Sequence, residues 1–174
     1  TIRVTDQHGD FADQQVTITI TGNTDAPTIT ATTDVSGEVR ELAEGELLEG
    51  NTTHSQAGSF LIADTDLGDI QTVSVTASSS TAGSVLGVLT PSVANNTTGD
   101  GSGEITWSYS VADSAIEHLG EGETITERFT ITVDDQQGGQ TPQVVEITIT
   151  GSNDTPTIDF DPGEDRGAVT ETGD

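Results

Sequence analysis

The sequence predicts an all-β protein built from antiparallel β-sandwich modules in tandem, and three observations support this prediction. Residues 1–29 return as residues 130–158 with 17 of 29 positions identical, which gives a period of 129 residues. A match at fixed spacing is the signature of a repeat array. Within the repeat, apolar residues alternate with Thr, as is typical of half-buried strands. Asp/Gly turns separate the short strands, and the only helical pattern, residues 112–119, is short enough to be one turn within a loop.

The repeat also predicts the domain boundaries. Each copy holds two alternating strands, a turn and a Gly-x-x-Asp-x-Pro linker. We therefore interpret residues 1–21 as the last hairpin of a preceding repeat, 22–27 as a linker, 28–158 as a complete module and 159–174 as the start of the next repeat. Because residues 1–21 duplicate strands that the module already has, we expect them to pack poorly. A chain that begins at Thr and contains no Met is expected to be a piece of a longer protein.

Seven strands are predicted within the module. They cover residues 28–33, 59–63, 70–77, 85–93, 104–111, 123–133 and 143–150. Alternation is strict in two of them, where Ile105, Trp107, Tyr109 and Val111 share one face, as do Val145, Ile147 and Ile149. Seven short antiparallel strands separated by turns indicate an Ig-like sandwich, with the single Trp107 at the centre of its core.

Composition limits the possible functions. Thirty acidic residues against four Lys and Arg give a formal net charge of −26, while Leu, Ile, Val and Phe make up only about 22% of the chain. Self-repulsion of that size opposes compaction, and bound divalent cations are the simplest way to neutralise it. Direct binding to nucleic acid is excluded because it requires Lys and Arg clusters. The chain has no Cys, so thiolate metal sites and disulfides are excluded too.

The expected topology places the acidic loops at the two ends of the sandwich. One end should carry the linker 22–27 and the loops 64–69 and 134–139, where oxygen ligands at alternate positions could converge on one Ca²⁺. Its candidate ligands are Asn23, Asp25, Asp64, Asp66, Asp69, Asp134 and Asp135. The other end should carry the linker 151–156 and an acidic set made of Glu38, Glu41, Glu44, Glu117, Glu121 and Glu123. The alternative interpretation is that these acids are simply solvated surface.

Several motifs together resemble a VCBS repeat, a cadherin-like module of giant bacterial surface proteins that include RTX-type adhesins. The matching segments are residues 37–41 (GEVRE), 58–66 (GSFLIADTD), 107–109 (WSY), 119–126 (LGEGETIT), 129–139 and 151–156 (GSNDTP). The resemblance implies tandem arrays, type I secretion to the bacterial cell surface, and calcium at the junctions between modules. By position it implies that Ca²⁺ is bound by Glu41, Asp64, Asp66, Asp135, Asn153 and Asp154.

Two functional hypotheses follow. The first is an extender module, one calcium-rigidified link in a secreted adhesin that serves cell-surface and biofilm adhesion. Its partners would be the neighbouring repeats of the same chain, and any host or surface ligand would bind other regions of the parent protein. The second is a module that binds carbohydrate or peptide in a calcium-dependent manner. We expect neither catalysis nor membrane insertion, since no catalytic motif or long apolar run is present, and we expect His54 and His118 at the surface.

Overall fold

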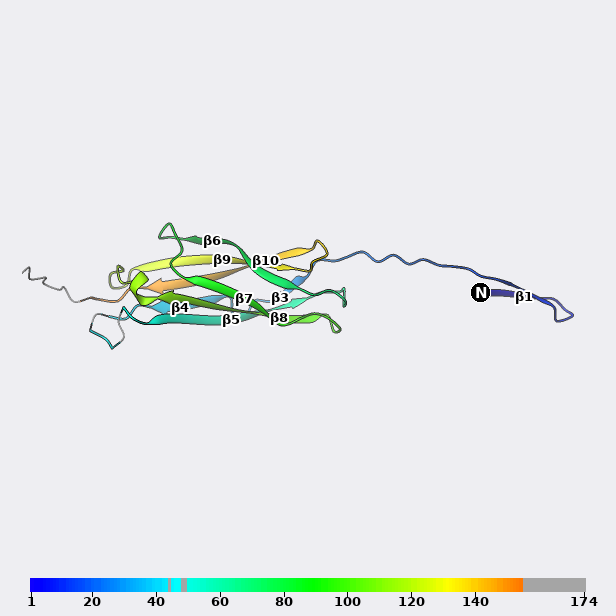
Figure 1. Ribbon diagram of the computed structural model, residues 1–174, viewed down its shortest axis with the longest axis horizontal. Coiled ribbons are helices and arrows are strands. Elements are labelled where there is room, and N and C mark those ends of the chain that lie inside the picture. The colour runs from blue at the N-terminus through cyan, green and yellow to red at the C-terminus, as the bar shows by residue number, and fades with distance from the viewer. Residues whose placement is uncertain (44, 48–49, 155–174) are drawn as a thin grey trace, which may run out of the picture.

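The computed structural model describes residues 1–43, 45–47 and 50–154 and confirms the all-β, Ig-like fold (Figure 1). Residues 28–150 form a sandwich of two four-stranded sheets. The first sheet has the order β3 (Thr28–Ala31), β5 (Thr53–Ala63), β8 (Ser102–Ala112) and β7 (Val88–Asn95). The second has the order β4 (Ser36–Arg40), β10 (Gln140–Thr150), β9 (Thr124–Asp134) and β6 (Thr72–Ser80). The predicted helical turn is the 3₁₀ segment η1 (Asp113–Ala115).

The structure has one strand more than the seven predicted for the module. Each of the seven predicted ranges overlaps a strand, although β5 begins at Thr53, before the predicted range 59–63. The eighth strand is β4, which pairs in parallel with β10, while β3 pairs antiparallel with β5. The sequence of β4, SGEVR, hides this because Gly and Glu are poor strand formers. Glycine suits the packing here, because a Cβ at Gly37 would lie 2.9 Å from Ile147 Cδ1 and would force one of the two to shift. The chain therefore crosses from one sheet to the other between β3 and β4.

The core lies between the sheets, where the alternating residues of β8, β9 and β10 meet. Ile105, Trp107, Tyr109 and Val111 are all buried on β8, which confirms the predicted face and the central position of Trp107. The indole Nε1 of Trp107 donates a hydrogen bond to the carbonyl of Asp34 at 2.9 Å, so its one polar group is satisfied. These buried side chains hold the loops at both ends of the sandwich in fixed positions.

The N-terminal residues stand apart from this core. Strands β1 (Ile2–Thr5) and β2 (Phe11–Gln14) pair antiparallel with each other, and residues 15–27 contain no regular element. Every residue from 1 to 26 is exposed, and Figure 1 shows the hairpin extending away from the sandwich.

Parts of the sequence-based interpretation lie outside the described residues. These are Glu44, residues 155–158 at the end of the predicted module, and the predicted start of the next repeat at 159–174. Among the described residues, no helix is long and apolar enough to span a membrane.

Candidate metal centre

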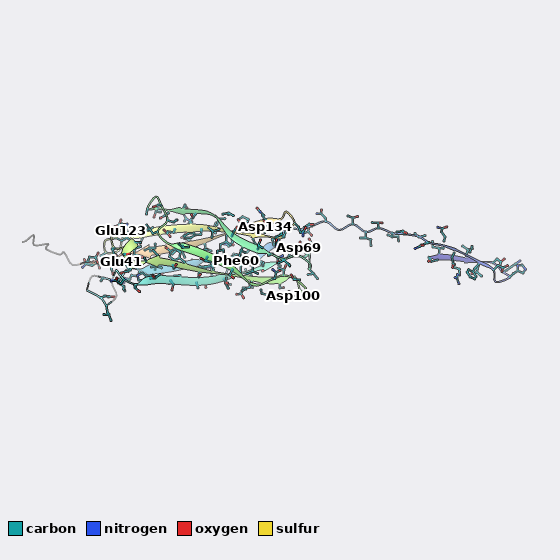
Figure 2. All side chains as sticks on the ribbon, viewed as in Figure 1. Glu41, Phe60, Asp69, Asp100, Glu123 and Asp134 are labelled. Atoms are coloured by element: carbon teal, nitrogen blue, oxygen red, sulfur yellow. The ribbon has the colours of Figure 1, made fainter. Side chains whose placement is uncertain are left out.

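The topology gathers acidic side chains at both ends of the sandwich, as predicted. We call one end the aspartate end; it comprises residues 22–27, 64–71, 96–101 and 135–139. The opposite end, the glutamate end, comprises the described residues of 41–52 together with 81–87, 113–123 and 151–154. Figure 2 shows Asp69, Asp100 and Asp134 at or near the first end and Glu41 and Glu123 at the other. Each end also carries one linker, so both acidic groups lie where the chain enters or leaves the module.

Three carboxylates converge at the aspartate end. Asp64, Asp66 and Asp69 each offer an oxygen, and these oxygens all lie within 4.8 Å of one another. Two hydrogen bonds within the loop stabilise this arrangement. The Asp66 amide donates to Asp64 Oδ1 at 3.0 Å, and the Asp69 amide donates to the Asp66 carbonyl at 2.9 Å. Oxygens that bind one Ca²⁺ at ~2.3–2.6 Å are at most about 5 Å apart. The spacing of this cluster therefore fits a single cation.

Asp135 from the β9–β10 loop faces the same cluster. Its side chain is buried, at 1% exposure, and its Oδ1 accepts hydrogen bonds from the amides of Gln137 at 2.7 Å and Gly139 at 2.8 Å. Asp135 Oδ2 and Asp69 Oδ2 are both buried and have no hydrogen-bond partner within the described part of the chain. The two residues also line one hollow in the surface.

The electrostatics of this end oppose four ionised carboxylates without a counter-ion. Burial raises the pKa of Asp69, and the nearby charges of Asp66, Asp64 and Asp135 raise it further. A charged acceptor that is shielded from water and has no hydrogen-bond partner is destabilising. A divalent cation would supply the missing partner for both Oδ2 atoms, so the residues present fit a calcium site.

The incoming linker is attached to this cluster. The Asp25 amide donates to Asp66 Oδ2 at 2.7 Å, and the Thr65 hydroxyl donates to Asp25 Oδ2 at 3.0 Å. Asn23 is exposed, and its side-chain amide donates to the neighbouring Thr24 carbonyl at 3.4 Å. Among the predicted ligands, Asp25 thus lies beside the three-carboxylate cluster, whereas Asn23 hydrogen bonds only its own neighbour among the bonds described.

Asp134 is engaged in its own hairpin. Its Oδ1 accepts from the Gln136 amide at 2.6 Å and its Oδ2 from Gln140 Nε2 at 2.5 Å. The Gln140 bond, followed by the Gln136 bond, lowers the pKa of Asp134. The structure therefore brings Asp64, Asp66, Asp69 and Asp135 together and uses both Asp134 oxygens to shape the adjoining turn.

At the glutamate end, Glu41 occupies a comparable position. It is buried, at 2% exposure, and its Oε2 accepts from the Ser152 amide of the outgoing linker at 2.8 Å. Its Oε1 is buried and has no hydrogen-bond partner among the described residues. Burial raises the pKa of Glu41, and the charges of Asp154 and Asp113 add to this, while the Ser152 amide acts in the opposite direction. Asn153 and Asp154 follow on the linker and are exposed.

Asp113 is a buried acid that the sequence did not single out. Its Oδ1 accepts from His54 Nε2 at 2.6 Å and from the Leu42 amide at 3.2 Å, and its Oδ2 accepts from the Gly50 amide at 2.7 Å. Burial alone would raise its pKa, but the bonds from His54, Gly50 and Leu42 outweigh burial and lower it. Asp113 therefore ties the loop after β4 to η1. The prediction that His54 lies at the surface is wrong, because its side chain is only 17% exposed and packs on Asp113.

Glu127 is a second buried acid that was missed. It is on the core face of β9 between Ile125 and Phe129, and it accepts bonds from the Leu86 amide at 2.5 Å and from Tyr109 Oη at 2.9 Å. Burial raises the pKa of Tyr109, and its bond to Glu127 raises it further. Both Glu127 oxygens are occupied by donors from the protein, so this residue pins the turn before β7 and does not suit a metal.

Comparison with known proteins adds little beyond the fold. No family model and no curated protein matches the chain. Among solved structures it is similar to the CooA pilin subunit of enterotoxigenic Escherichia coli, with 10% identity, a TM-score of 0.47, and coverage of 75% of this chain and 99% of that one. It is also similar to AggA, the major subunit of aggregative adherence fimbriae type I of Escherichia coli, with 14% identity, a TM-score of 0.37, and coverage of 76% of this chain and 100% of that one. The cadherin-like domains 1 to 4 of zebrafish RET match with 10% identity and a TM-score of 0.38, and the match covers 75% of this chain and 27% of that one. All three TM-scores are below 0.5, so these likenesses extend no further than the sandwich fold.

Proposed function

We propose that the sandwich is an extender module whose two acidic ends bind Ca²⁺ and so stiffen its junctions with neighbouring modules. One observation carries the proposal: each end holds buried carboxylate oxygens that have no partner among the described residues, and each of these groups lies beside a linker. At the aspartate end these atoms include Asp69 Oδ2 and Asp135 Oδ2, and at the glutamate end they include Glu41 Oε1.

The residues of each end define what a cation would do there. At the aspartate end, Asp64, Asp66, Asp69 and Asp135 would hold the ion, and Asp25 already connects the incoming linker to Asp66. At the glutamate end, Glu41 would hold it together with Asn153 or Asp154 of the outgoing linker, which Glu41 anchors through Ser152. The bound ion supplies charge neutralisation, which converts mutual repulsion between carboxylates into attraction to a common centre.

Stiffness follows from the short linkers. Residues 22–27 include Gly22, which permits a bend, and Pro27, which fixes one φ angle, so the bare linker is only partly restrained. A cation that joins linker and loops would remove the remaining freedom. In keeping with the resemblance to VCBS repeats, we propose that such modules form the stalk of a secreted bacterial surface adhesin that takes part in biofilm formation.

The alternative, calcium-dependent binding of a carbohydrate or peptide, would use a hollow at the aspartate end. That hollow is lined by Asp25, Ala26, Thr28, Ala63, Asp64, Thr65, Leu67, Asp100 and Gly101. No aromatic ring belongs to this lining, whereas Phe60, Trp107, Tyr109 and Phe129 are buried in the core. Sugar sites depend on exposed aromatic faces and convergent polar groups, so the extender function is favoured.

Small-angle X-ray scattering on two complete modules in tandem tests the proposal. In millimolar Ca²⁺ we expect a narrow, extended particle, and in EDTA a broader distribution of shapes. The same tandem with Asp135→Asn and Glu41→Gln in both modules is the control and should give the broad distribution in both buffers. Identical profiles of the parent tandem with and without Ca²⁺ would refute the stiffening mechanism and favour the ligand-binding alternative.

A further inference from the structure

Residues 1–21 carry an exposed apolar face that has a buried counterpart within the sandwich. Subtracting the 129-residue period from Val145, Ile147 and Ile149 gives Val16, Ile18 and Ile20, and the residue types are identical. The three counterparts on β10 are fully buried, whereas Ile18 is 80% and Ile20 90% exposed. Ile2 and Val4 are likewise exposed, and they correspond to the buried Ile131 and Val133 of β9. The five apolar positions of this face, residues 2, 4, 16, 18 and 20, therefore keep the residue types of their buried counterparts.

The backbone of the two hairpins agrees as well. In β1–β2, Ile2 pairs with Gln14 and Thr5 with Phe11. In β9–β10, the residues 129 positions later have the same pairing, Ile131 with Gln143 and Asp134 with Gln140. A one-residue slip would turn every side chain to the opposite face, so identical register means identical inward faces.

The turns match in their hydrogen bonds. Asp6 Oδ1 accepts from the amides of His8 at 2.8 Å and Asp10 at 3.0 Å, which repeats the bonds that Asp135 Oδ1 receives from Gln137 and Gly139. The loop thus takes its folded shape without any sandwich around it. What the segment lacks is a surface for its apolar face.

The sandwich of residues 28–150 cannot provide that surface. Its corresponding position is filled by β10, which pairs with both β9 and β4. The linker 22–27 is also too short. To occupy that position, Thr21 would have to lie at the glutamate end while Thr28 begins β3 at the aspartate end, about 36 Å away along an 11-residue strand. The seven residue steps from Thr21 to Thr28 span at most ~25 Å.

We infer that residues 1–21 are the docking element of a second β-sandwich of the same kind, distinct from residues 28–154. This partner supplies an inner apolar face, a strand equivalent to β4 that pairs in parallel with residues 16–21, and the counterpart of Thr124–Phe129 in β9. The counterpart of Ile149↔Val39 would place Ile20 against an apolar residue of that edge strand. This inference is independent of cation binding and concerns only which surface covers this segment.

Transplanting the segment tests the inference. In a full-length chimera, residues 130–150 are replaced by the sequence of residues 1–21, which has equal length and shares 12 of 21 positions. We expect cooperative melting within about 10 °C of the parent chain in the same buffer, with Trp107 fluorescence reporting a buried indole. The matched control is the same chimera with Ile147→Asp, which places a charge in the core and should abolish the transition.

Two of the substitutions that the transplant introduces could prevent folding for reasons unrelated to the apolar face, so a second chimera omits them. Arg3 would replace the buried Thr132, which bonds Thr76 Oγ1 at 2.8 Å, and Asp10 would replace Gly139, where a Cβ would lie 2.6 Å from Ala26 Cα. The second chimera therefore keeps Thr132, Gly139 and Pro142, the last because its counterpart Asp13 pairs with Arg3. Folding of either chimera supports the inference, and failure of both overturns it.

Discussion

Two buried aspartates at opposite ends of the sandwich illustrate different uses of the same side chain. Asp113 at the glutamate end is 0% exposed and Asp135 at the aspartate end is 1% exposed. Donors on the protein engage both oxygens of Asp113, including His54 and the Gly50 amide. Asp135 has two donors on Oδ1 and none among the described residues on Oδ2. Burial by itself therefore does not mark a metal ligand; a buried oxygen without a donor is the more informative feature.

Removing Asp113 should produce the largest effect. Asp113→Ala leaves His54 and the amides of Leu42 and Gly50 without their acceptor, and breaking a buried charged network of this kind costs about 3–5 kcal/mol. Urea denaturation followed by Trp107 fluorescence should show this loss equally in EDTA and in millimolar Ca²⁺. A loss that appears only in Ca²⁺ would mean that Asp113 is itself a ligand, and the contrast with Asp135 would disappear.

Replacing Asp135 should have a smaller effect that depends on calcium. In Asp135→Asn the side-chain oxygen can still accept from the Gln137 and Gly139 amides, so the turn is kept while one charge is lost. A site with a Kd of ~0.1 mM contributes about 1.4 kcal/mol at ~1 mM Ca²⁺. We expect the parent chain to gain this stability on addition of Ca²⁺ and the variant to gain little or none.

The control for this experiment is Asp6→Asn in the N-terminal hairpin. Asp6 makes the equivalent turn bonds but lies outside the sandwich and is exposed, so this variant should keep the full calcium-induced rise in melting temperature. An unchanged rise in Asp135→Asn would show that the aspartate end does not bind the ion through this residue.

The contrast between the two aspartates also shows how far the sequence could be interpreted. Asp135 was predicted because it lies in an Asp- and Gly-rich turn between two alternating strands, a local pattern. Asp113 stands alone in its segment, and its bond to Gly50 joins residues 63 positions apart, which no local pattern encodes. The burial of Glu127 could have been predicted, since it occupies an inward position of the alternation between Ile125 and Phe129. The seven strand ranges were predictable from period-two alternation. Strand β4 was not, because it is defined by its parallel pairing with the edge of β10 and not by its own sequence pattern.

Glu41 should behave like Asp135 but more weakly. Its site is completed by the exposed Asn153 and Asp154 of the linker, which have less support from the sandwich than the loops at the aspartate end. With a Kd of ~1 mM, such a site adds about 0.4 kcal/mol at ~1 mM Ca²⁺. Calorimetric titration should find a weaker class of site that Glu41→Gln removes and Asp135→Asn leaves intact. Loss of both classes in either single variant would contradict the separation of the two ends.

Acidification without calcium should have a smaller effect on stability, and its sign should differ between carboxylates whose pKa is raised and those whose pKa is lowered. The pKa values of Glu41 and Asp69 are raised above 4.5 and 3.8, chiefly by burial, so the folded state takes up protons before the unfolded state does. In EDTA, stability should therefore rise as the pH falls from 7 through these raised pKa values towards 4.5 and 3.8. The pKa of Asp113 is lowered below 3.8, so its contribution to stability is present above that value and is lost as the pH falls through the lowered pKa.

A stability maximum at mildly acidic pH follows, measured as the urea midpoint at a series of pH values. The double variant Glu41→Gln, Asp69→Asn should lose part of the rise on the neutral side and keep the fall on the acidic side. A profile of this variant that superimposes on that of the parent chain would show that relief of the general net charge of −26, and not these two sites, governs the response.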